Sequence, residues 1–167
     1  CYQPYRRAGG KLPLVVIGKR IDEYLRARGF TDQDLADVHF LGFVPNARIH
    51  LAYQLAECFV LATLCESFGI PIVESFACGC PAIVPSTCAG PEIAGGAARL
   101  IDPLNEEDIA QALTEVTTST ELRQRMKQLG FKRVQTLTWR ETARRTLSVF
   151  NEIVPVDVSP RAETAPL

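Results

Sequence analysis

The sequence predicts an α/β fold: a parallel sheet, doubly wound with helices on both faces. Two observations support it. Short β-branched runs, several of them closed by glycine, alternate with helical segments between residues 12 and 101. The chain has 167 residues, about one domain, and its 47% hydrophobic residues are enough for a sizeable core. Ligands of such sheets bind beyond the carboxyl ends of the strands, so functional residues are expected there.

The expected elements follow one another in a regular order. Continuous apolar runs predict buried strands over residues 12–18, 37–42, 58–62, 81–85 and 99–101. Helical spacing, capping residues and helix-ending glycines predict helices over 21–28, over 47–56 after Asn46, and between Pro71 and Gly79. Residues 90–96 are expected to form a glycine-rich connection. Three closing helices reach about residue 153, and their starts are indicated by Asn105 with Asp108, Thr118 with Glu121, and Thr138 with Glu141.

Composition narrows the classes of function. The formal net charge of −1 gives no global attraction for nucleic acid. No apolar run approaches the roughly 18 residues that span a bilayer, and no secretory leader is visible, so we expect a cytoplasmic protein. We expect residues 1–154 to form the domain and residues 155–167 to form a flexible tail. Because the chain begins with Cys1, we expect it to be a fragment of something longer.

The cysteines and the common motifs point to no metal site and no familiar catalytic loop. Five cysteines lie inside or beside apolar segments and are expected to be reduced core residues: Cys58, Cys65, Cys78, Cys80 and Cys88. The spacing of Cys78 and Cys80 is too tight for the usual zinc site. The sequence also lacks a dinucleotide fingerprint after the first strand, a P-loop and a nucleophile elbow.

Chemistry is concentrated in residues 66–74, directly after the third strand and at the opening of a helix. Gly69 lets the backbone approach a ligand closely, and the amides that follow it form an anion cradle at the helix N-terminus. Glu74 can reach the same crevice and accept hydrogen bonds from a diol such as a ribose. Either Glu66 or Glu74 alone is equally well explained as an acid near a helix N-terminus. Their combination favours a binding site.

These nine residues resemble the E-x7-E signature of retaining glycosyltransferases of family 4, the group 1 glycosyltransferases, which have the two-domain GT-B fold. Further segments match in the same order. They are Phe40–Val44 with F-L-G-x-V, Cys78–Pro81 with A-C-G-x-P, Pro91–Gly95 with P-E-V-x-G, Leu100–Pro103 with L-V-D-P, and Thr138–Arg140 with F-S-W-E. The resemblance covers about residues 12–153.

The resemblance implies that the chain is the Rossmann-like, C-terminal half of such an enzyme, without the N-terminal acceptor-binding domain. Glu66 would be the catalytic residue that contacts donor-sugar hydroxyls. The other residues would bind the nucleotide sugar: Phe68, Gly69 and Ile70 with the sugar and diphosphate, Glu74 with the ribose, Phe43 and Val44 with the base, and Gly18 where the nucleotide passes the first strand.

The implied reaction is retaining transfer of a hexosyl group from a UDP- or GDP-sugar to a glycan or lipid-linked acceptor. It would need no metal or other cofactor, because cations and helix amides stabilise the leaving diphosphate. The isolated domain would be inactive. The alternative is a non-catalytic nucleotide or sugar-nucleotide binding module. A glycosidase pair would need carboxyl groups about 5–9.5 Å apart across a glycosidic bond, which the spacing does not demand. An epimerase or phosphorylase would bring histidines or a cofactor lysine that we do not find.

Residues 121–145 contain eight basic residues against two acids. This pattern is typical of a solvated helix face. A second interpretation is peripheral attraction to anionic lipid at the inner face of the membrane.

Overall fold

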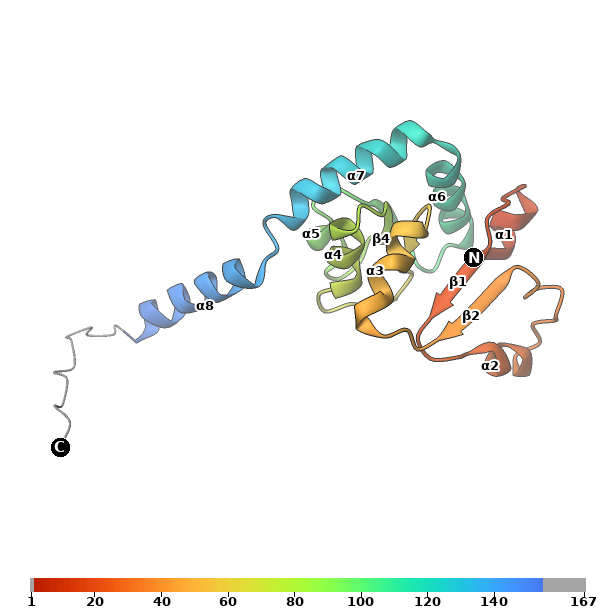
Figure 1. Ribbon diagram of the computed structural model, residues 1–167, viewed down its shortest axis with the longest axis horizontal. Coiled ribbons are helices and arrows are strands. Elements are labelled where there is room, and N and C mark those ends of the chain that lie inside the picture. Colours follow the sequence, from red (N-terminus) through yellow and green to blue (C-terminus); the bar gives the residue numbers. More distant parts are fainter. Residues whose placement is uncertain (1, 155–167) are drawn as a thin grey trace. The chain divides into compact units, whose positions relative to one another are not determined.

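The computed structural model describes residues 2–154 (Figure 1). Its strands are β1 (Leu14–Ile17), β2 (Val38–Gly42), β3 (Phe59–Val60), β4 (Ala82–Pro85) and β5 (Arg99–Ile101). Its helices are α1 (Tyr2–Arg7), α2 (Asp22–Ala27), α3 (Asn46–Leu55), α4 (Ile70–Ala77), α5 (Gly90–Ala94), α6 (Glu106–Thr118), α7 (Thr120–Val134) and α8 (Trp139–Ile153). Two compact units result, the first ending at Val134 and the second beginning at Gln135. The predicted tail at 155–167 lies outside the described residues.

All strand pairs are parallel, as predicted, but the strands form two sheets instead of one. One sheet pairs β1 with β2, and the other has the order β3-β4-β5. Only two of the five residues expected in the third strand keep strand geometry. Their ladder runs to β4: the Phe59 N–H donates to the Pro81 carbonyl at 2.8 Å and the Leu61 N–H to the Ile83 carbonyl at 2.9 Å. In residues 2–154 no ladder of hydrogen bonds joins β3 to β1, so the two sheets are separate.

Helix starts with a side-chain cap were predicted well. The Asn105 carboxamide oxygen accepts hydrogen bonds from the first turn of α6, and the Thr138 hydroxyl accepts one from the Glu141 N–H of α8. The predicted start at Thr118 is wrong by one residue. Ser119 Oγ accepts from the Leu122 N–H at 3.1 Å, while Thr118 ends α6 and donates to the Thr114 carbonyl.

Three further differences involve helix ends and short helices. Asn46 is the first residue of α3 and not its cap, because Pro45 occupies the cap position. Helix α1, which has only six residues, was not predicted. Within the expected connection at 90–96, Pro91 lies in the first turn of the five-residue helix α5, and Gly95 ends that helix with φ +53°.

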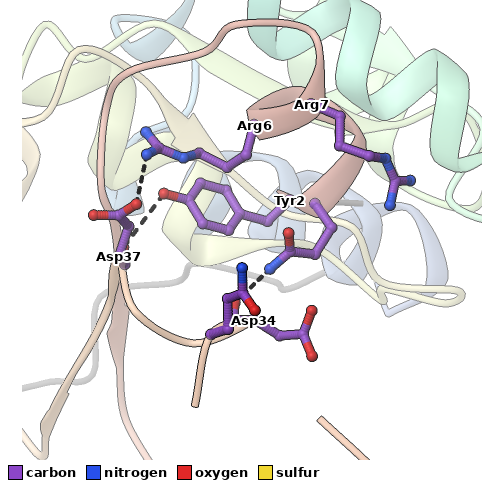
Figure 2. A pocket seen from close by; sticks show the side chains of 7 residues that line it. Tyr2, Arg6, Arg7, Asp34 and Asp37 are labelled. Atoms are coloured by element: carbon purple, nitrogen blue, oxygen red, sulfur yellow. Dashed lines mark hydrogen bonds and ion pairs between the residues drawn. The ribbon is translucent and has the colours of Figure 1, made fainter. Parts of the chain in front are cut away.

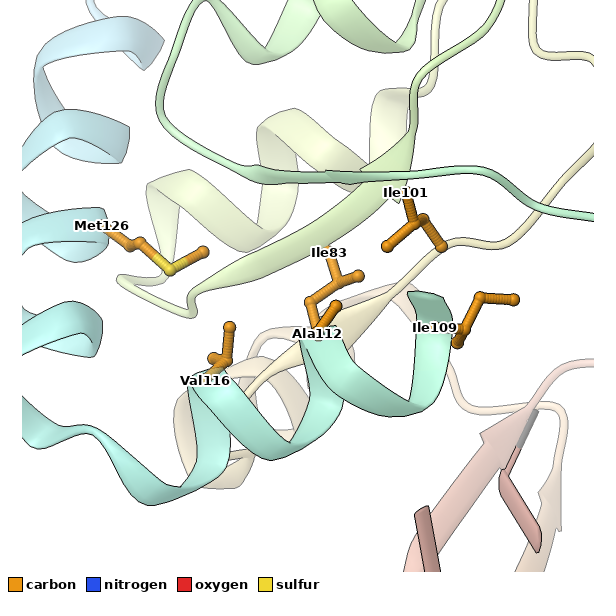
Figure 3. Packing of buried hydrophobic residues seen from close by; sticks show 6 residues of the cluster. All are labelled: Ile83, Ile101, Ile109, Ala112, Val116 and Met126. Atoms are coloured by element: carbon orange, nitrogen blue, oxygen red, sulfur yellow. The ribbon is translucent and has the colours of Figure 1, made fainter. Parts of the chain in front are cut away.

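The hydrophobic core lies around β4, all four residues of which are buried. Ile83 of this strand packs with residues of β5, α6 and α7, shown in Figure 3: Ile101, Ile109, Ala112, Val116 and Met126. On α4, Phe76 is 1% exposed and faces α7, where a Cβ built on Gly130 would lie 3.0 Å from Phe76 Cδ1. Glycine at this position therefore lets α4 and α7 approach closely, which fixes α4 relative to the sheet.

No helix in residues 2–154 combines the length and the apolar character needed to cross a membrane.

Candidate functional site

The loops that follow β3 and β4 meet at the carboxyl edge of their sheet, where the sequence placed the site. The Ala89 N–H donates to the Glu66 carbonyl at 3.3 Å, and the Thr87 hydroxyl donates to the Leu64 carbonyl at 3.4 Å. These bonds hold the backbone of Glu66 beside the loop after β4. Two neighbouring parallel strands thus contribute to one edge, as ligand sites of such sheets require.

Gly69 connects this loop to α4 and has the left-handed conformation, with φ +84°. Its carbonyl accepts a hydrogen bond from the Ile72 N–H at 2.8 Å, which starts the helix, and Pro71 lies in the first turn as predicted. A Cβ at position 69 would lie 2.7 Å from Ile72 Cδ1 and 3.3 Å from Glu66 Cγ. The stem of Glu66 therefore packs beside the glycine at the N-terminus of α4.

The backbone N–H groups of Phe68, Gly69 and Ile70 lie at the N-terminus of α4. Across the described residues, these three amides donate no hydrogen bond to another protein group. The helix dipole adds partial positive charge at the same end of α4. Phe68 and Ile70 have side chains 44% and 53% exposed, so solvent reaches this segment from outside. Such a run of amides can hydrogen-bond a sugar or a phosphate.

Glu74 is held by a residue that the sequence analysis missed. Its carboxylate oxygen Oε2 accepts a hydrogen bond from the Tyr53 hydroxyl of α3 at 3.0 Å. The Tyr53 ring also packs edge-on against Phe59 of β3, with centroids 5.5 Å apart. Burial, and then the hydrogen bond to Glu74, raise the pKa of Tyr53 well above its usual range, so the hydroxyl remains a donor. Nothing in the local pattern around Tyr53 signals this contact.

Gly18, Phe43 and Val44 lie together at the carboxyl ends of β1 and β2. The Gly18 N–H donates to the Gly42 carbonyl at 2.9 Å, next to Phe43. Gly18 has φ +120°, which favours glycine, and the Phe43 side chain is 82% exposed. The predicted site residues thus fall into two groups, this one and the group at Glu66–Glu74. Within residues 2–154 the hydrogen bonds described above join residues inside each group.

Thr63 also lies beyond the end of β3, and its hydroxyl is unusual. The Oγ1 atom is buried and has no hydrogen-bond partner within the described part of the chain. Leaving a buried hydroxyl unpaired costs about 1–3 kcal/mol. Sequence reasoning did not single out this residue.

The prediction that the cysteines are core residues is wrong for two of them. All five described cysteines are free thiols, but Cys65 and Cys88 are exposed because they lie on the loops after β3 and β4 and not in the strands. In contrast, burial raises the pKa of Cys58 to about 11 and that of Cys80 to about 12. Among the described residues, no group of three His, Cys, Asp or Glu side chains is arranged to hold a metal ion.

Two cavities lie elsewhere in the first unit. One, of about 360 Å³, lies between α1 and the segment before β2; Figure 2 shows Arg6 pointing to Asp37 in its wall. The other, of about 330 Å³, lies between α1 and α6. Neither is lined by a predicted site residue. The loop segment at Glu66–Ile70 is instead an open edge, and its polar groups are the Glu66 carboxylate and the backbone amides.

Several of the eight basic residues are engaged within the protein. Arg123 pairs with Glu57 at 3.0 Å, and Arg133 donates to the carbonyls of Glu92 and Ile93. In the second unit, Arg144 and Arg145 both pair with Glu141 on the same helix. Lipid attraction by this segment stays a prediction.

Solved structures share this fold. A sucrose-phosphate synthase from Thermosynechococcus elongatus has a TM-score of 0.72 and 20% identity, covering 84% of this chain and 38% of that one. A glycosyltransferase from Rickettsia africae has a TM-score of 0.73 and 17% identity, covering 89% and 42%. The chain therefore has the Rossmann-like α/β architecture of GT-B glycosyltransferase structures, as predicted.

The sequence comparison identifies the family. Residues 5–133 match the family described as "Glycosyl transferases group 1", and the chain belongs to that family. It is 25% identical over 113 residues to O-antigen chain mannosyltransferase B from Escherichia coli, covering 68% of this chain and 30% of the relative. It is 30% identical over 110 residues to D-inositol 3-phosphate glycosyltransferase from Thermobifida fusca, covering 65% and 25%. The chain thus spans about a third or less of the length of these curated relatives.

Proposed function

We propose that this chain is the C-terminal, donor-binding half of a retaining glycosyltransferase that uses a UDP- or GDP-sugar. One observation carries the proposal: Glu66 and the three amides at 68–70 lie at the start of α4, at the carboxyl edge of a parallel sheet, and Glu74 lies in the second turn of the same helix. The domain that carries them belongs to a glycosyltransferase family. Relatives named mannosyltransferases make a mannosyl donor the first one to test.

Each part of this segment has a role in the proposed reaction. The Glu66 carboxylate accepts hydrogen bonds from donor-sugar hydroxyls and orients the sugar ring. The amides of Phe68, Gly69 and Ile70 bind the sugar and the diphosphate. As the bond between the anomeric carbon and the diphosphate breaks, negative charge grows on the leaving oxygens, and preorganised amides stabilise it without reorganising. No metal ion or other cofactor is required in this proposal.

The nucleoside would bind across the two groups of site residues. Glu74, oriented by Tyr53, accepts hydrogen bonds from the ribose hydroxyls. The exposed Phe43 and the half-buried Val44 contact the base, and Gly18 leaves room for the nucleotide beside β1. A second domain, which this chain does not contain in our proposal, would bind the glycan or lipid-linked acceptor. The chain alone then binds donor and transfers no sugar.

The proposal also covers the cellular location of the enzyme. We place the enzyme in the cytoplasm, with a peripheral contact between anionic lipid and the exposed Arg125, Lys127 and Lys132 of α7. Sedimentation with vesicles containing phosphatidylserine tests this contact, since binding should fall as salt increases. Vesicle binding that does not depend on salt would contradict it.

Calorimetric titration with UDP, GDP, UDP-glucose and GDP-mannose, with and without magnesium, tests donor binding. We expect saturable, metal-independent binding to either the uridine or the guanosine compounds. Glu66→Ala should abolish binding of the sugar nucleotide, and Glu74→Ala should abolish binding of both the sugar nucleotide and the free nucleotide. Glu121→Ala is the matched control, because Glu121 is an exposed acid at the start of α7. Unchanged affinity in both site variants would overturn the assignment.

The alternative, a binding module without turnover, is tested by fusing the chain to the N-terminal domain of a relative. Sugar transfer by the fusion supports the enzyme. Normal donor binding with no transfer would favour the binding module.

A further inference from the structure

The two exposed cysteines form a close pair across the candidate site. Cys65 lies on the loop after β3 and Cys88 on the loop after β4, 23 positions apart in the sequence. Their Sγ atoms are 3.5 Å apart, with the Cys88 thiol donating to Cys65. A disulfide has a sulfur separation of about 2.05 Å. The two sulfurs are therefore only about 1.5 Å farther apart than in a disulfide.

The backbone around the pair already holds the two loops together. The Thr87 hydroxyl donates to the Leu64 carbonyl, and the Ala89 N–H donates to the Glu66 carbonyl, so each cysteine has a tethered neighbour on either side. Cys88 itself has φ +51° and is the one residue other than glycine with a positive φ in the described chain. A cysteine in this strained conformation, facing a second thiol, is held there by its surroundings.

The remaining described cysteines lack this combination of exposure and proximity. Cys58 and Cys78 are half-buried and Cys80 is buried. Burial raises the pKa of Cys58 and Cys80 and also shields their sulfurs from solvent, whereas Cys65 and Cys88 are exposed. An external oxidant should therefore react selectively at Cys65 and Cys88.

We propose that Cys65 and Cys88 are a thiol–disulfide exchange site, at which a small-molecule disulfide such as oxidised glutathione closes a reversible cross-link between the loops after β3 and β4. One cysteine thiolate attacks the glutathione disulfide, forms a mixed disulfide and releases one glutathione thiolate. The second cysteine thiolate then attacks the protein sulfur of the mixed disulfide and releases the other glutathione. The protein loses two protons and two electrons, and glutathione disulfide gains them.

The cross-link would restrain the loop that carries Glu66, because Cys65 is its immediate neighbour in the chain. This inference does not depend on the proposed sugar-nucleotide site, since it is read out by peptide mass, thiol count and melting temperature. The disulfide would close a loop between two residues 23 positions apart, and closing such a loop stabilises a protein by constraining its unfolded chain. We expect the melting temperature to rise by roughly 5 °C or more on oxidation.

The experiment uses the full chain in a Cys1→Ser background, because Cys1 lies outside the described residues. The protein is incubated with oxidised glutathione at about pH 8.5, since the Cys88 thiol raises the pKa of Cys65. Non-reducing digestion and mass spectrometry then map the disulfides. We expect a linked Cys65–Cys88 peptide, loss of two titratable thiols, and full reversal by reduced dithiothreitol.

Single cysteine variants distinguish a specific Cys65–Cys88 cross-link from general oxidation of the thiols. Cys65→Ser and Cys88→Ser should each stop at a stable mixed disulfide with glutathione on the remaining cysteine, whereas Cys78→Ser should cross-link as the parent does. A parent protein that carries glutathione on both cysteines without linking them would overturn the proposal. So would a cross-link that lowers the melting temperature, because the sulfurs would then be poorly placed.

Discussion

The hydrogen bond between Tyr53 and Glu74 can be removed without disturbing the packing around it. Tyr53→Phe deletes the hydroxyl that donates to Glu74 Oε2 and keeps the ring that packs edge-on against Phe59. The substitution therefore isolates one polar contact between α3 and α4. It leaves the carboxylate half-buried without its protein donor.

The expected magnitude follows from the geometry. Hydrogen bonds to charged groups contribute about 1.5–3 kcal/mol. At 3.0 Å this bond is at the long end of the range for hydroxyl donors, and both residues are only partly buried, so we expect the low end, about 1.5 kcal/mol. For a domain of this size the melting temperature should fall by about 3–6 °C.

Donor affinity supplies the second measurement. If Tyr53 orients Glu74 toward the ribose, we expect nucleotide binding to weaken by about three- to tenfold, since 1.4 kcal/mol corresponds to a factor of ten. Urea unfolding and calorimetry are run on Tyr53→Phe, Glu74→Gln and the double variant. A coupling energy in unfolding below about 0.3 kcal/mol would refute the reasoning, because residues in contact should not behave additively.

Other predictions concern stability and its dependence on pH. Phe76→Ala should lower the free energy of unfolding by about 3–5 kcal/mol in urea titrations, and a loss below about 1 kcal/mol would contradict its place in the core. Thr63→Val should raise stability by about 1 kcal/mol by removing an unpaired buried hydroxyl, whereas destabilisation would mean that Oγ1 has a partner. The Asp102 N–H and Arg99 hold the pKa of Asp108 below its usual range, so its contribution is present above about pH 4 and lost as the pH falls further. Asp108→Asn should therefore reduce stability at pH 7 much more than at about pH 3, and an equal loss at both would refute this cause.

Features encoded by neighbouring residues were predicted well. The caps at Asn105 and Thr138 are correct because a capping side chain and its amide are separated by only two or three residues. The start of α4 was also correct, since Gly69 and Pro71 specify it locally. The short helices α1 and α5 were missed because five or six residues are too few to show helical periodicity.

Features encoded by distant residues were not predicted. Tyr53 contacts Glu74 across 21 positions, and Cys65 contacts Cys88 across 23. Each residue is visible in the sequence, but the pairing depends on which strand lies beside which. The division of the strands into two sheets has the same origin, because a run of apolar residues does not reveal how much of it will find a partner.

Gly69 shows why a short pattern of residue types was informative despite these limits. Its positive φ favours glycine whatever the ligand, and a Cβ there would push on Ile72 in the helix and on the stem of Glu66 in the loop. A Cβ atom at position 69 would thus collide with the first turn of α4 and would also displace the side chain of Glu66, the candidate catalytic residue. Fold and proposed function therefore constrain this position through the same contacts, and a substitution such as Gly69→Ala should impair both together. At Tyr53, by contrast, the hydroxyl that binds Glu74 can be removed while the ring keeps its contact with Phe59, so the loss of one polar contact can be measured there without a loss of packing.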